Sequence, residues 1–145
     1  MADLFIKYFG KDSDKIINPI FLFAKRNKVI ENIITIGNYK NENNDIKIMD
    51  KKIPEHSVII IVEKDLDITI FNPTKKDIVI RYHNPGIEFF PVESKVMAPG
   101  KKLKIPLKAL MKLRKKSKYF FTISIPKKKP SPVGKNEYSF TIVKE

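Results

Sequence analysis

The feature that most constrains this chain is a series of short apolar runs, separated at intervals of about ten residues by Gly, Pro, Asn or Asp. In many of the runs apolar and polar residues alternate, and a period of two places successive side chains on opposite faces of a strand. The runs are rich in Ile, Val, Phe, Thr and Tyr, which strands favour. The sequence therefore predicts an all-β chain, an antiparallel β-sandwich of immunoglobulin-like or jelly-roll-like type with about 9–11 strands.

One segment, residues 107–116, is a candidate for a helix and reads "LKALMKLRKK". It is short, and Leu107, Leu110 and Met111 form only a ragged apolar stripe. We predict at most one short helix here, a turn or two between strands. The alternative is a basic amphipathic helix that lies on a membrane surface.

Length and composition favour one globular domain over residues 1–145. The chain is 42% apolar and 31% charged, and no apolar run approaches the ~20 residues that a bilayer span requires. The first residues lack the pattern of a secretory signal, and cysteine is absent. Both observations favour an intracellular, cytoplasmic protein without redox or thiolate chemistry.

Three polar segments are predicted to be turns or loops. Residues 72–76, "NPTKK", join two apolar runs, and Asn before Pro is good turn chemistry, so we interpret this segment as a structural corner rather than a functional loop. Residues 37–47 are predicted to be a mobile, hairpin-like loop. Residues 126–137 contain prolines that exclude a central strand, and they too are predicted to be a mobile loop.

Basic residues are concentrated in the last third of the chain. The net charge is +13, and residues 101–145 contain 14 Lys and Arg against 2 Asp and Glu, whereas residues 1–100 are nearly balanced. Heavy use of Lys, Ile and Asn is typical of an AT-rich genome, which could be that of a low-GC bacterium, a parasite or other AT-rich eukaryote, or a large DNA virus or phage. It does not explain the uneven distribution. A segregated basic field attracts polyanions. The alternative is a solvated face that aids solubility.

The basic residues of this third fall mainly into three clusters, "KKLK", "KLRKKSK" and "KKK". The candidate residues for binding a polyanion or an acidic partner are Lys101, Lys102, Lys104, Lys112, Arg114, Lys115, Lys116, Lys118, Lys127, Lys128 and Lys129. Lysine dominates this set, and lysine lacks the bidentate fork with which arginine reads guanine edges. We therefore expect any contact with nucleic acid to involve the phosphate backbone and to be sensitive to salt.

Several motifs from residue 57 onwards follow one another in a recognisable order. An apolar strand ends in Asn72-Pro73-Thr74, and a second strand, an F-x-V element, "APG" and an alternating strand follow. This order resembles the immunoglobulin-like sandwich of the major sperm protein and of the ASPM/SPD-2/hydin-type families. The resemblance implies a seven-stranded portion over residues 57–145 and a cytoskeletal or scaffold role. Residues 1–56 then supply extra N-terminal strands, which either enlarge the sandwich or add an edge hairpin layer.

Tyr119 adds a further point of resemblance. It lies two positions before Phe121, which is predicted to face inward, as the tyrosine-corner residue of such sandwiches does. The alternative is an ordinary exposed strand tyrosine.

Residues that carry catalysis or bind metals are scarce. His56 and His83 have no metal-ligand spacing around them, no serine lies in a nucleophile-elbow motif, and no glycine cluster could hold phosphate. "KDSDK" at 11–15 lacks the further oxygen ligands of a calcium site. We therefore expect no enzyme, no catalytic or metal-binding residue and no cofactor.

These observations lead to two main hypotheses about function; a third, an enzyme, would require folding to bring carboxylates or His83 together. The first is a non-enzymatic structural or assembly protein, a β-sandwich module that engages itself or an acidic partner through its basic C-terminal third. A virion or phage structural protein belongs to this class, and its location would then be the virion. The alternative is a nucleic-acid-binding protein that contacts the phosphate backbone through residues 101–129, although aromatic residues are poorly interleaved with these lysines.

Overall fold

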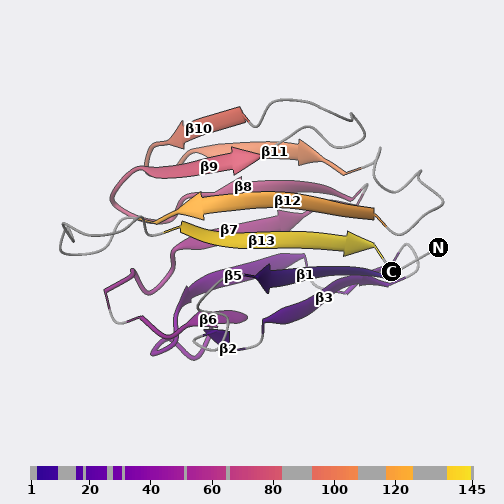
Figure 1. The fold of residues 1–145 in the computed structure, drawn as a ribbon, viewed down its shortest axis with the longest axis horizontal. Coiled ribbons are helices and arrows are strands. Elements are labelled where there is room, and N and C mark those ends of the chain that lie inside the picture. Colours follow the sequence, from indigo (N-terminus) through magenta and orange to yellow (C-terminus); the bar gives the residue numbers. More distant parts are fainter. Residues whose placement is uncertain are drawn as a thin grey trace.

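The protein is an all-β sandwich of two sheets, which confirms the predicted fold class (Figure 1). The computed structural model describes residues 3–9, 16–17, 19–25, 28–30, 32–50, 52–64, 66–82, 93–107, 117–125 and 137–144. These residues form thirteen strands and no helix. The helix candidate at 107–116 lies, except for Leu107, outside the described residues.

One sheet has seven strands and the other has six. The seven-stranded sheet has the order β10 (Glu93–Met97), β9 (Ile78–Tyr82), β12 (Ser117–Ser124), β13 (Glu137–Lys144), β1 (Leu4–Phe9), β3 (Ile20–Lys25) and β4 (Lys28–Val29). The six-stranded sheet has the order β11 (Lys102–Pro106), β8 (Asp67–Phe71), β7 (Val58–Val62), β5 (Ile33–Asn38), β6 (Ile46–Ile48) and β2 (Ile16–Ile17). The number of strands exceeds the expected 9–11 because β2 and β4 have only two residues each, too few to show an alternating pattern in the sequence.

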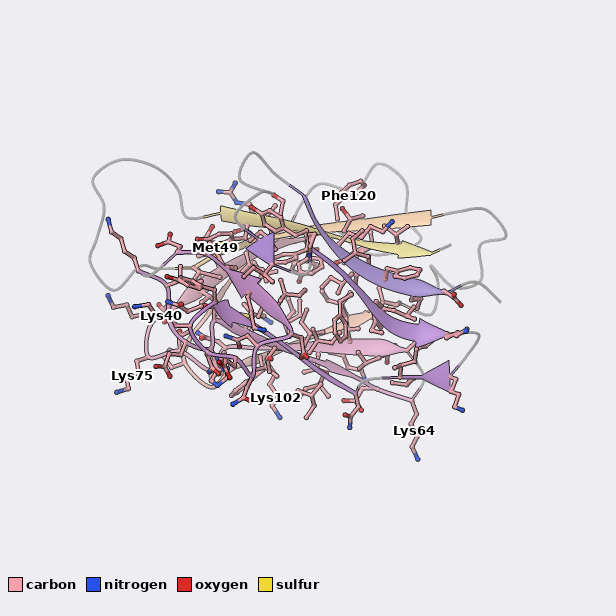
Figure 2. The ribbon with its side chains drawn as sticks, turned by 90° about the horizontal axis from the view of Figure 1, so that it is seen from below. Lys40, Met49, Lys64, Lys75, Lys102 and Phe120 are labelled. Carbon is pink, nitrogen blue, oxygen red and sulfur yellow. The ribbon has the colours of Figure 1, made fainter. Side chains whose placement is uncertain are left out.

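Alternation along the strands builds the core between the sheets. Tyr119, Phe121 and Ile123 of β12 are buried, and they are adjacent to the residues of β13 that face the same way. The rings of Phe121 and Phe140 stack with centroids 5.5 Å apart. The outward residue Phe120 remains exposed (Figure 2). The period-two pattern of the sequence is thus the pattern of burial.

Strands β7 to β13 have the strand order of an immunoglobulin domain. β11-β8-β7 correspond to strands E-B-A, and β10-β9-β12-β13 correspond to C′-C-F-G. Earlier strands extend both sheets: β1, β3 and β4 lie beyond β13, and β5, β6 and β2 lie beyond β7 (Figure 1). The described part of residues 1–56 therefore enlarges the sandwich, one of the two arrangements expected from the sequence.

Tyr119 is fully buried, so its interpretation as an exposed strand tyrosine is wrong. It lies on β12, which corresponds to strand F, two positions before the buried Phe121. Burial raises the pKa of its hydroxyl, and the nearby Tyr82 and Glu93 add to this effect. The tyrosine corner stays a prediction, because the preceding residues 108–116 lie outside the described part of the chain.

Among the strands of the described residues, one pair departs from antiparallel order. β5 and β6 are parallel, with Ile36 opposite Ile46 and Asn38 opposite Ile48, so the prediction of a hairpin-like loop at 37–47 is wrong. A parallel connection ordinarily needs a dozen or more residues, and here a short loop crosses back instead. Side-chain hydrogen bonds shape it: the Asp45 carboxylate accepts from the backbone N–H of Thr35 at 2.9 Å.

Candidate functional site

Asn72, at the end of β8, is a buried polar residue whose side chain makes four hydrogen bonds. Its Nδ2 donates to the backbone oxygens of Lys76 (2.8 Å) and Met97 (2.9 Å). Its Oδ1 accepts from the backbone N–H of Thr74 (2.9 Å) and from the Thr74 hydroxyl (2.7 Å). The predicted corner at 72–76 is therefore held internally by one amide side chain.

The backbone of Asn72 also holds a second turn, the one that connects β10 to β11. The Asn72 N–H donates to the Lys101 carbonyl at 3.1 Å, and the Asn72 carbonyl accepts from the Gly100 N–H at 2.9 Å. Gly100 has φ +80°, in the left-handed region that glycine adopts without steric cost. Two turns far apart in the sequence are thus joined at a single residue.

These two turns place four exposed lysines at one end of the six-stranded sheet. We call Lys75, Lys76, Lys101 and Lys102 the basic corner. In Figure 2, Lys75 and Lys102 both point away from the sandwich on the side of this sheet. Because their backbones are fixed through Asn72, the charges are gathered without the cost of ordering a loose loop.

Two lysines of β11 lie on the outer face of the six-stranded sheet and have different neighbours. Lys102 is paired across the strands with Phe71, and its Nζ lies 5.9 Å from the centre of that ring. Lys104 forms an ion pair with Asp67 at 3.3 Å. Cation–π contacts at exposed sites contribute about 0.5–1 kcal/mol, so Phe71 orients Lys102 but does not neutralise it.

An apolar strip continues from these lysines across the outer face of the sheet. Ile59 lies beyond Phe71, and in the next row Ile61 and Ile33 lie beyond Thr69. Ile33 is 47% exposed. Phe71 is distant from the lysines in the sequence because it belongs to a different strand, and only the pairing of β8 with β11 brings it beside Lys102.

The structure places the predicted site residues on more than one surface. Lys101, Lys102 and Lys104 lie together on β11 and the turn before it. Lys118 lies on β12 of the seven-stranded sheet, where its backbone pairs with Val143. The remaining candidates, Lys112, Arg114, Lys115, Lys116, Lys127, Lys128 and Lys129, lie outside the described residues.

The position of β11 supplies a structural reason for its lysines. β11 is an edge strand, and Lys side chains and Pro on an edge strand discourage pairing with other chains. Lys102, Lys104 and Pro106 fit that role. Edge protection therefore explains one member of the basic corner, Lys102. It does not explain the other three, Lys75, Lys76 and Lys101.

The second polar network surrounds Gly37 and the loop after β5. Asn44, which is buried, donates through Nδ2 to the backbone oxygens of Asn38 (2.9 Å) and Glu55 (2.6 Å). A Cβ added to Gly37 would collide with that Glu55 oxygen. Glycine is therefore required here by the close approach of the neighbouring backbone.

His56 completes this network through both ring nitrogens. Nε2 lies 3.1 Å from Asn41 Nδ2, which can only donate, so the ring proton is assigned to Nδ1, which donates to Asn44 Oδ1 at 3.1 Å. The imidazole therefore organises the loop. Among the residues that the structure describes, no three His, Asp or Glu side chains cluster in a way that could hold a metal ion. His83 lies outside that part of the chain.

No family model, curated protein or solved structure matches this chain. In the ranges described above, no helix has the length and apolar character needed to cross a membrane.

Replacing Lys75 and Lys76 with Ser should change the free energy of unfolding by less than about 0.5 kcal/mol, since exposed charges contribute little. The Lys76 carbonyl that accepts from Asn72 belongs to the backbone and is retained. Urea unfolding of the double variant checks this expectation. A loss of several kcal/mol would show that the lysine side chains themselves hold the turn.

Proposed function

We propose that this protein is a non-enzymatic interaction module of structural or assembly type, which binds an acidic partner through the basic corner. The observation that carries the proposal is the attachment of both lysine-bearing turns to the buried Asn72. A fixed array of like charges costs folding stability through repulsion. Such an array is expected where it meets a partner of opposite charge. An intracellular or virion location fits this role.

A second candidate function is binding to single-stranded nucleic acid along the outer face of the six-stranded sheet. The half-buried Phe71 beside Lys102 favours it, because bases stack on aromatic rings that lie next to basic residues. One ring gives a limited platform. Arg81 lies on β9 of the other sheet, away from this face. We therefore rank an acidic protein segment above nucleic acid.

The test compares two matched double variants by fluorescence anisotropy with labelled polyglutamate across a range of salt concentrations. Lys101→Glu/Lys102→Glu changes the basic corner, and Lys25→Glu/Lys28→Glu makes the same change of charge on β3 and β4 at the other edge of the sandwich. We expect the corner variant to lose about tenfold or more in affinity, and the wild-type affinity to fall steeply with salt. The control variant should lose less than about threefold.

Equal losses of affinity in both variants would show that the net charge of the whole protein attracts the probe. That result would contradict specific binding at the basic corner. A parallel titration with single-stranded RNA separates the two candidates. If RNA binds more tightly than polyglutamate and Phe71→Leu removes that preference, the nucleic-acid function is favoured.

A further inference from the structure

We infer that the exposed edge of β10 pairs with β10 of a second copy, which joins two seven-stranded sheets across a two-fold axis. This inference concerns the assembly role proposed above and rests on it. Its surface is separate from the basic corner. β10 lies at the edge of its sheet and pairs with β9, and within the described part of the chain no strand covers its other side.

The exposure of β10 is the first argument. Four of its five residues, from Glu93 to Val96, are exposed, and only Met97 is buried. Val96, at 61%, is the most exposed large apolar side chain among the described residues. An uncovered edge strand is a template for pairing, and β11 carries Lys and Pro against such pairing. β10 instead carries one acidic and one basic residue.

The charges of β10 select a single register. Glu93, Lys95 and Met97 share one face, because Met97 is opposite the buried Ile78 and Glu93 is opposite Tyr82. In an antiparallel pair centred on Ser94, Glu93 of each copy lies directly opposite Lys95 of the other. Shifting the axis to Lys95 would place two lysines opposite each other, which is unfavourable. Only the Ser94-centred register matches both charges.

Lys95 also lies on the inner face of an edge strand, a placement that ordinarily blocks pairing because the charge would be buried without a partner. In the Ser94-centred register that partner is Glu93 of the second copy. Glu93 lies opposite Tyr82 on the neighbouring strand, and burial of Tyr82, together with the nearby Glu93 side chain, raises the pKa of the tyrosine. The inward-facing Lys95 therefore disfavours pairing of β10 in other registers and permits the register centred on Ser94.

The complex has two-fold symmetry and uses the same strand from both copies. We expect a weak, reversible dimer, because pairing of two short strands buries less than the ~1,600 Å² of a standard interface. Sedimentation velocity at about 0.15 M salt, where the Debye length is ~8 Å and the net repulsion is screened, should show a monomer–dimer equilibrium.

The decisive test uses the variants Glu93→Lys and Lys95→Glu. Each variant alone places like charges opposite each other and should weaken dimerisation at least about tenfold. Mixed in equal amounts, the two variants should form a heterodimer, because every lysine of one copy then lies opposite a glutamate of the other. Circular dichroism checks that each variant is folded. Homodimers unaffected by either change, or a mixture that stays monomeric, would overturn the inference.

Cross-linking supplies an independent measurement that does not change the charges. The chain has no cysteine, so Ser94→Cys introduces one thiol, which the two-fold axis brings opposite its own copy. Mild oxidation should yield a covalent dimer at protein concentrations where the control Val96→Cys, two positions along the same face, yields about tenfold less. Equal yields would indicate random collision and would contradict the register. Failure of polyglutamate binding would leave both β10 tests unaffected.

Discussion

Asn72→Ala should lower the free energy of unfolding by about 3–5 kcal/mol, the largest loss that we expect from truncating a polar side chain in this protein. The substitution removes four hydrogen bonds at once and leaves the Met97 carbonyl without its side-chain donor in a buried position, whereas the Lys76 carbonyl keeps the Thr74 hydroxyl as a donor. Both turns of the basic corner lose their common attachment. Urea or thermal unfolding measures the effect.

Two further asparagine variants make this prediction specific. Asn72→Asp retains an oxygen toward Thr74 but turns a carboxylate toward two carbonyls, so it should be at least as destabilising as Asn72→Ala. Asn43→Ala changes an exposed asparagine of the other loop and should cost less than about 0.5 kcal/mol. If Asn72→Ala and Asn43→Ala had similar effects, Asn72 would be an ordinary turn residue.

Gly37→Ala is expected to destabilise the protein by about 3 kcal/mol, or to prevent folding. The new methyl group would push away the Glu55 carbonyl and the Asn44 amide that donates to it. That displacement would separate β5 from the backbone beside it and disturb the contacts of His56. Thermal unfolding, with near-UV circular dichroism as a check on packing, measures the loss.

Gly100→Ala is the matched comparison, since Gly100 is required for its backbone conformation and Gly37 for the close approach of a neighbouring backbone. A Cβ at Gly100 meets nothing within 4 Å, and only its φ of +80° disfavours alanine. The expected cost is about 1–2 kcal/mol, less than at Gly37. A larger loss at Gly100 than at Gly37 would contradict the assignment of Gly37 to close packing.

Local patterns were sufficient to predict the class of fold. Alternation along segments such as Val58–Val62 places Val58, Ile60 and Val62 in the core, as period two requires. The corner at 72–76 was also predictable, because Asn-Pro chemistry is local. Strands β2 and β4 were not, since two residues cannot show a period.

Contacts between distant segments account for what the sequence did not predict. Asn72 resembles any turn asparagine until the Met97 carbonyl, 25 residues later, accepts from it. The loop at 37–47 has the composition of a mobile segment, yet Asn44 and His56 close it through bonds that span 12 residues. Phe71 becomes part of the site only through the pairing of β8 with β11.

The position of β13 has a consequence for biosynthesis. This strand is inserted between β12 and β1, so Leu4 is paired with Lys144 and Phe9 with Ser139. The ribosome makes β1 early, but the strand that covers one of its edges is made only at the end of the segment. Until then the β13 side of β1 has no strand to pair with, and the apolar face of β1 lacks this part of its cover. We expect such non-local pairing to slow folding and to leave the exposed apolar face of β1 open to aggregation until β13 has been made.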